Sequence, residues 1–237
     1  ALQKSLTRLS SGSRITQPAD DAGGLAVSMK LSGTINRLSG VEKNIDNAIS
    51  FLQVQDGVLD SAGKILDRMA ELKALSQDVL KNDSDIANYN AEFKNLQVQL
   101  HQMSNTTFNG VSLFATTNDT GDAKFNTIGS GNTVSIFTSA SGESGSIVSI
   151  NKTALLSALT IDAGNIDTAQ TFQAASTAGD EIRSFGSATV GDAFELGDVS
   201  VAVFTQALQN VATLRAENGG SVSRLQFSKE SAAAQKT

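Results

Sequence analysis

The chain of 237 residues has no cysteine and no tryptophan, and it has only one proline, one tyrosine and one histidine. Without cysteine it cannot form a disulfide, a thiolate metal site or a cysteine nucleophile. The single histidine, His101, cannot build a histidine-rich metal centre, and no H-E-x-x-H pattern surrounds it. The sequence is poor in the side chains that enzymes use for chemistry, so we predict no enzyme activity, no cofactor and no metal site.

Charge and hydropathy limit the possible partners. The chain has 18 Lys and Arg against 24 Asp and Glu, and its basic residues are dispersed, so we predict no nucleic-acid partner. No apolar run approaches the roughly 20 residues that cross a bilayer, so we predict no membrane segment. The polar start Ala1–Leu6 lacks the pattern of a cleaved secretory signal. An exported chain would therefore leave the cell by a route that reads no such signal.

A long proline-free stretch from about Asp20 to Val79 carries apolar residues that lie mostly three, four or seven positions apart. These are Leu31, Ile35, Leu38, Ile45, Ile49, Leu52, Leu59, Leu66 and Met69. Such heptad spacing is typical of the seam of a coiled coil or a long bundle helix. A helix of this extent would be on the order of 90 Å long, which is too long for a compact domain of this mass. We therefore predict an elongated rod.

A second helix is predicted after the turn at 81–84, with Asp83 or Ser84 as its cap. Its apolar residues alternate spacings of three and four without a break, which is the clearest coiled-coil pattern in the chain. We predict that this stripe lies in the core of the rod. Its members are Ile86, Tyr89, Phe93, Leu96, Leu100 and Met103.

Beyond Met103 the pattern changes to short alternating segments of the kind that form strands. We predict two or three hairpin strands in 108–114, 123–128 and 133–137, with a turn at 129–132. The fold class is therefore mainly α with a β-hairpin region, in which long coiled-coil-like helices from both ends of the chain form the rod.

The remaining chain divides at a change in composition. The segment 139–192 is rich in Ser, Gly, Ala and Thr, and we predict a variable, surface-exposed β and loop segment. We predict that 1–138 forms the amino-terminal part of the rod and that 193–237 forms its carboxy-terminal helix. The apolar residues of this last helix recur at helical spacing, at Val201, Phe204, Leu208, Val211, Val222 and Leu225. Asn218-Gly219-Gly220 interrupts this pattern.

Three blocks of the sequence have the pattern of one known protein family. The run Leu9–Ile15 followed by Ala19–Ala26 is similar to the amino-terminal signature of bacterial flagellins. The block Ser104–Val111 resembles the segment that closes the second rod helix, and Thr127–Ile136 resembles the second hairpin. Together with the last helix around Val222–Leu225, the resemblance covers both flanks of the chain. It implies that the chain begins and ends inside the conserved region and lacks most of both terminal polymerisation helices.

The resemblance implies a structural subunit of the bacterial flagellar filament, which is secreted and assembles with copies of itself for swimming motility. It also implies an export chaperone and a filament cap as partners. One alternative is a hook–filament junction protein of the same superfamily, although the motif blocks and their order favour flagellin. A less favoured alternative is an exported adhesin or enzyme on a flagellin frame, with its activity in the middle segment.

Two clusters of polar residues invite a chemical interpretation and do not support it. Ser10-Ser11-Gly12 and the pair Asp20-Asp21 lack a general base, so helix capping and a turn are the better interpretation. The carboxylates of Asp56, Asp60 and Asp67 follow one side of a helix, whereas a calcium loop places its ligands close together along the chain. We interpret these as a solvated helix face.

Many flagellins are recognised by a vertebrate Toll-like receptor, and the resemblance extends to that motif. Asp67–Leu72 is similar to it at Arg68, Glu71 and Leu72, which makes these residues candidate receptor contacts. The second arginine of the motif is Ala70 here, and the acidic residue of the second helix is Gln99. The alternative is that Arg68 and Glu71 form a weak surface pair at helical spacing.

Overall fold

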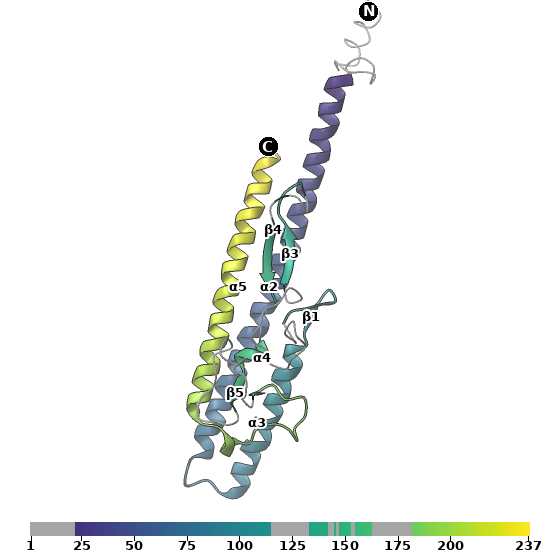
Figure 1. Ribbon diagram of the computed structural model, residues 1–237. Coiled ribbons are helices and arrows are strands. Elements are labelled where there is room, and N and C mark those ends of the chain that lie inside the picture. The colour runs from purple at the N-terminus through teal and green to yellow at the C-terminus, as the bar shows by residue number, and fades with distance from the viewer. Residues whose placement is uncertain (1–21, 115–132, 142–144, 146, 153–154, 163–181) are drawn as a thin grey trace, which may run out of the picture.

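The computed structural model describes residues 22–114, 133–141, 145, 147–152, 155–162 and 182–237. Its long helices are α2 (Ala22–Ser76), α3 (Asp83–Ser104) and α5 (Val201–Gln235). In Figure 1, α5 runs beside α2 in the opposite direction, and α3 turns back from the lower end of α2. The 55 residues of α2 correspond to a length of about 80 Å. The prediction of a mainly helical rod is therefore confirmed.

The seam between α2 and α5 is the most extensive contact of the described chain, and it contains most of the core. Both helices carry buried residues at spacings of three, four and seven, as the heptad pattern requires. On α2 they include Leu38, Ile45, Leu52, Leu59, Leu66, Met69 and Leu72. On α5 they include Val203, Phe204, Ala207, Val211, Leu214, Leu225 and Ala232.

Asn218-Gly219-Gly220 does not interrupt α5, contrary to the prediction. Asn218 is buried, and its side-chain amide donates hydrogen bonds to the Leu52 carbonyl and to Gln55 Oε1, both at 2.9 Å. Gly219 and Gly220 lie on the exposed face of the helix. Tertiary hydrogen bonds from a polar core residue therefore outweigh the weak helix propensity of the glycines.

The described strands form three antiparallel pairs. The first is β1 (Thr107–Phe108) with β2 (Val111–Ser112), the second is β3 (Thr133–Phe137) with β4 (Ile147–Asn151), and the third is β5 (Thr160–Asp162) with β6 (Ile182–Ser184). Asn109 and Gly110 join β1 to β2 with positive φ angles of 50° and 79°. Two successive positive φ angles define the tight hairpin turn that Asn-Gly favours.

The predicted strand at 133–137 is β3, and its partner in the described structure is β4. Residues 123–128, predicted as another hairpin strand, lie outside the described residues. The strand β4 belongs to the segment expected to be variable and surface-exposed. That segment also contributes α4 (Leu155–Ala158) and fully buried side chains at Leu155, Leu159 and Phe185. Part of it therefore belongs to the core, while the division of the chain into domains stays a prediction.

The predicted stripe of α3 faces the core unevenly. Phe93 and Leu100 are fully buried, while Tyr89, Leu96 and Met103 are half-buried against the core and Ile86 is half-buried. Phe93 meets Phe185 and Phe204 edge to face, with ring centroids 6.3 and 6.0 Å apart. The cap of α3 is Asn82, whose Oδ1 accepts a hydrogen bond from the Asp85 amide at 2.8 Å, and not the predicted Asp83 or Ser84.

We predict that Phe93→Ala lowers the free energy of unfolding by roughly 3–5 kcal/mol, because it leaves a cavity where α3, α5 and the loop at Phe185 meet. Chemical denaturation measures this loss. The same substitution at the exposed Phe227 is the control and should change the value by less than about 0.5 kcal/mol. A loss at Phe93 as small as that of the control would contradict the burial of this ring.

Candidate interaction surfaces

Acidic residues of α2 face basic residues of α5 along the rod. Arg215 donates to both carboxylate oxygens of Asp56 at 2.9 and 3.2 Å and reaches Asp60 at 3.2 Å. Lys229 contacts Asp46 at 2.7 Å, and the hydrogen bonds and ion pair raise the pKa of its ammonium group. Asp56 and Asp60 thus pair with an arginine, and no cluster that could hold a metal occurs among the described residues.

A second set of contacts is made by polar side chains to which the sequence alone assigned no role. Gln97 donates to the Phe194 carbonyl and accepts from the Phe194 amide, each at 2.8 Å. Asn90 Oδ1 accepts from the Leu196 amide at 2.9 Å, and Lys73 donates to the Leu196 carbonyl at 2.7 Å. These bonds fix the segment before α5 on α2 and α3. The signal in the sequence is that Gln97 falls four residues after Phe93, within the stripe.

The candidate receptor patch is an ion-pair cluster on the rod surface. Arg68 donates to both oxygens of Glu92 on α3, at 2.8 and 3.1 Å, and contacts Glu71 on its own helix at 3.0 Å. The hydrogen bond from Arg68 lowers the pKa of the Glu92 carboxyl, while those same partners raise the pKa of the guanidinium. Gln99 is exposed on α3.

Leu72 departs from the expected patch because its side chain is fully buried. It follows Met69 by three residues in the α2 seam, so it packs inward and is no exposed contact. His101 is half-buried near the end of α3, and it belongs to no metal cluster in the described part of the chain. The Ser10-Ser11-Gly12 and Asp20-Asp21 clusters lie outside the described residues.

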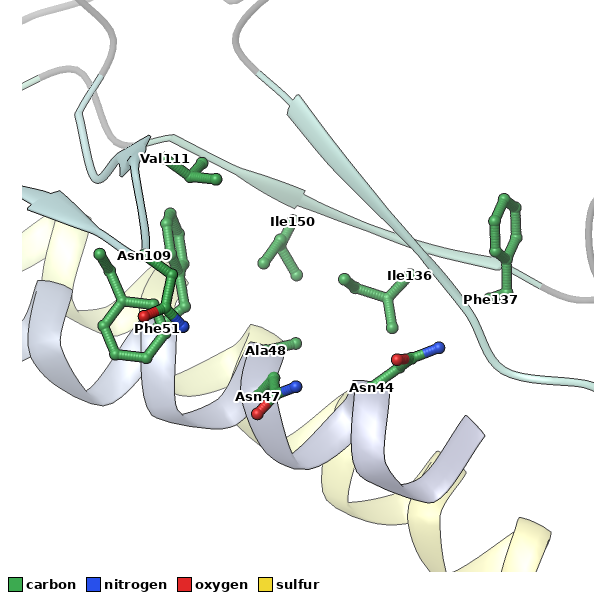
Figure 2. A pocket seen from close by; sticks show the side chains of 10 residues that line it. Asn44, Asn47, Ala48, Phe51, Asn109, Val111, Ile136, Phe137 and Ile150 are labelled. Atoms are coloured by element: carbon green, nitrogen blue, oxygen red, sulfur yellow. The ribbon is translucent and has the colours of Figure 1, made fainter. Parts of the chain in front are cut away.

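An apolar pocket of 380 Å³ opens between α2 and two of the hairpins. Figure 2 shows Ala48 and Phe51 of α2 below Ile136 and Ile150 of the β3–β4 pair. Phe51 meets Phe108 edge to face, with ring centroids 6.2 Å apart, at one end of the pocket. The polar lining residues are Asn44, Asn47 and Asn109.

A further apolar surface lies where α2 extends beyond the end of α5 (Figure 1). Val27, Met29, Leu31 and Ile35 are 42–67% exposed there. Val27, Leu31 and Ile35 are spaced by four residues and lead directly to the buried Leu38. Within the described part of the chain, the apolar face of the seam thus continues uncovered. None of the described helices is both long and apolar enough to cross a bilayer.

An elongated antiparallel helical rod with uncovered apolar faces defines a structural, helix-packing protein. The chain belongs to the bacterial flagellin family, because the model of the bacterial flagellin N-terminal helical region matches residues 1–119, about half of the chain.

Individual relatives agree with this assignment. A flagellin of Halalkalibacterium halodurans is 39% identical over 119 residues, which are 50% of this chain and 44% of that protein. The flagellar filament 30.7 kDa core protein of Treponema maltophilum is 36% identical over 47% of this chain and 40% of its own length. A flagellin of Listeria monocytogenes is 29% identical over 93% of this chain and 69% of that protein. The chain therefore spans less than half the length of the first two relatives.

We predict that Glu92→Gln destabilises the protein at neutral pH and has no effect in strong acid. A carboxylate with a lowered pKa in the folded state stabilises the fold above its ordinary pKa of about 4.3. That contribution is lost as the pH falls through the lowered value. Thermal melting across this pH range measures the difference between wild type and variant.

The matched control adds Glu92→Gln to an Arg68→Gln background, where the arginine that lowers the pKa is gone. The pH-dependent difference should then disappear. A pH-dependent difference that persists without Arg68 would assign the effect to another contact of Glu92.

Proposed function

We propose that this protein is a structural subunit of an extracellular flagellar filament that serves swimming motility. The observation that carries the proposal is the apolar face of α2 from Val27 to Ile35, which continues the buried seam and has no partner in the described chain. Contiguous apolar surface of this kind marks an interaction site. In a polymer of helical rods a further helix can bury it.

A filament also requires a contact that repeats without closing. A rod with different surfaces along its length can pack head to tail and side by side, so one modest interface repeats many times. The relatives are named flagellins and filament core proteins, which favours this role over a hook–filament junction protein. No observation favours an adhesin or an enzyme. We also propose an export chaperone and a filament cap as partners of this protein.

We expect cells that lack this gene to have no filament and cells that carry only Leu31→Asp to have few or short filaments. A carboxylate on the uncovered α2 face opposes its burial against another helix, while the exposed position leaves the folded rod intact. Electron microscopy of the cells, with blotting for exported protein, measures this. Leu31→Met is the control and should give normal filaments. Normal filaments on cells that lack the gene would refute the proposal.

A vertebrate Toll-like receptor is a second candidate partner, and the partly exposed Arg68 beside the exposed Glu71 favours it. We expect weak binding, because affinity concentrates in a few anchors and two charges of the motif are replaced by Ala70 and Gln99. Ala70→Arg and Gln99→Glu should raise the affinity, and Arg68→Ala should abolish it.

Titration of the purified receptor ectodomain with each variant measures the affinities. Gln99→Glu alone is informative because Gln99 is exposed, whereas Ala70 packs partly against the core. A melting curve therefore accompanies the Ala70→Arg variant. Equal binding by wild type and Arg68→Ala would exclude the patch as a receptor site.

A further inference from the structure

We propose that the tip of the rod, Val79 and Leu80 in the turn between α2 and α3, inserts into the apolar pocket of a second copy that runs parallel to the first and is shifted along the rod axis. This inference rests on the proposed function and specifies which surfaces of two neighbouring subunits meet. The contact is heterologous, because tip and pocket are different surfaces of one chain, so it propagates along a line of copies.

The tip is an unusual turn. Val79 is 93% exposed and Leu80 is 89% exposed, more than any other large hydrophobic side chain of the described residues. Turns favour Gly, Asn, Asp, Ser and Pro. Exposing a pair of branched apolar side chains to water in a turn is unfavourable, and it brings no local stabilisation in return. Sequences break such local rules chiefly at functional sites.

The turn also holds the two side chains outward in a defined conformation. The Lys81 amide donates to the Asp78 carbonyl at 3.1 Å, which closes a four-residue turn with Val79 and Leu80 at its centre. Asp78 Oδ1 accepts a second hydrogen bond from the Leu80 amide at 2.9 Å. Little conformational entropy is then lost when the tip is buried in a partner.

The pocket matches this tip in chemistry. Its volume of 380 Å³ lies in the range of natural ligand pockets, and its walls are mainly aromatic and branched aliphatic side chains. Ile136 and Ile150 of the β3–β4 pair point toward Ala48 and Phe51 of α2, whereas the ring of Phe137 points away from that helix (Figure 2). The asparagine side chains in the lining can bond the polar backbone of an incoming turn.

Charge also matches between the two ends. The tip carries Asp78, Asp83 and Asp85 close together, and the Nζ of its nearby Lys81 lies 6.0 Å from the centroid of the Tyr89 ring. Lys43 is exposed one helical turn before the pocket residue Asn47, and it makes no ion pair with the described residues. An acidic tip can pair with Lys43 and is repelled by a second acidic tip, which favours tip-to-pocket contact over tip-to-tip contact.

The positions of tip and pocket set a regular spacing. The tip lies about 31 residues along the rod from Ala48, which corresponds to roughly 47 Å at the rise of an α-helix. Two copies in this contact run parallel and overlap by the part of α2 that precedes the pocket. That part includes the uncovered face from Val27 to Ile35, which then lies beside the lower rod of the next copy.

Cysteine cross-linking tests this contact, because the chain has no native cysteine. Full-length protein with Leu80→Cys and Asn47→Cys is assembled into filaments and oxidised, and we expect a ladder of covalent oligomers on a denaturing gel. The control pairs Leu80→Cys with Gln53→Cys, an exposed position on another face of α2, and should give no ladder. Filaments of the first variant without a ladder, or a ladder equally strong in the control, would overturn the inference.

Assembly of purified full-length subunits gives an independent measurement. Leu80→Ser should raise the critical concentration for polymerisation roughly tenfold to a hundredfold, because burial of the leucine side chain is lost. Leu80→Met should leave it nearly unchanged, and Lys43→Glu should raise it more at low than at high salt. An unchanged value for Leu80→Ser would overturn the inference alone, whereas failure of the wild-type protein to form any filament would overturn the proposed function.

Discussion

The antiparallel packing of α5 on α2 is the contact on which the rest of the structure depends. Neither helix can bury its apolar stripe alone, and an isolated helix of this kind gains most of its stability from tertiary packing. The ion pairs of Arg215, Lys229 and Lys236 with α2 carboxylates lie at the edge of this seam. The pairs of Arg215 and Lys229 are largely solvent-accessible and add little stability, yet all three pairs favour one relative direction and register of the two helices.

Buried amides attach the smaller elements to this seam. Gln55 donates to the Leu113 carbonyl at 2.7 Å and accepts from Asn218, so one side chain joins α2, α5 and the chain after β2. Gln97 of α3 bonds both the carbonyl and the amide of Phe194, so it attaches the chain before α5 to α3. Because an unpaired amide in the core is costly, these residues specify one arrangement where apolar residues would permit several.

The sequence predicts the helices well and their partners poorly. Heptad spacing identifies α2 and the buried positions Phe93 and Leu100, because periodicity is a local property. The pairing of β3 with β4 and the bonds of Asn218 depend on residues distant in the chain, so local signals did not indicate that pairing and marked Asn218-Gly219-Gly220 as an interruption of the helical pattern. For Leu72 a signal existed, since it continues the spacing of Leu66 and Met69, but the family motif assigned it to the surface.

The same helix carries both folding and assembly surfaces, and this follows from its length. A compact domain hides its apolar residues in one central core, whereas a rod has too little interior for all of them. In α2 the stripe is buried where α5 and the hairpins cover it and exposed from Val27 to Ile35. The tip residues Val79 and Leu80 are exposed for a different reason, because they lie in a turn at the end of the rod, where no helix or strand of the described residues covers them. Apolar surface therefore remains at the places that another rod can reach, which links the elongated shape directly to a polymer.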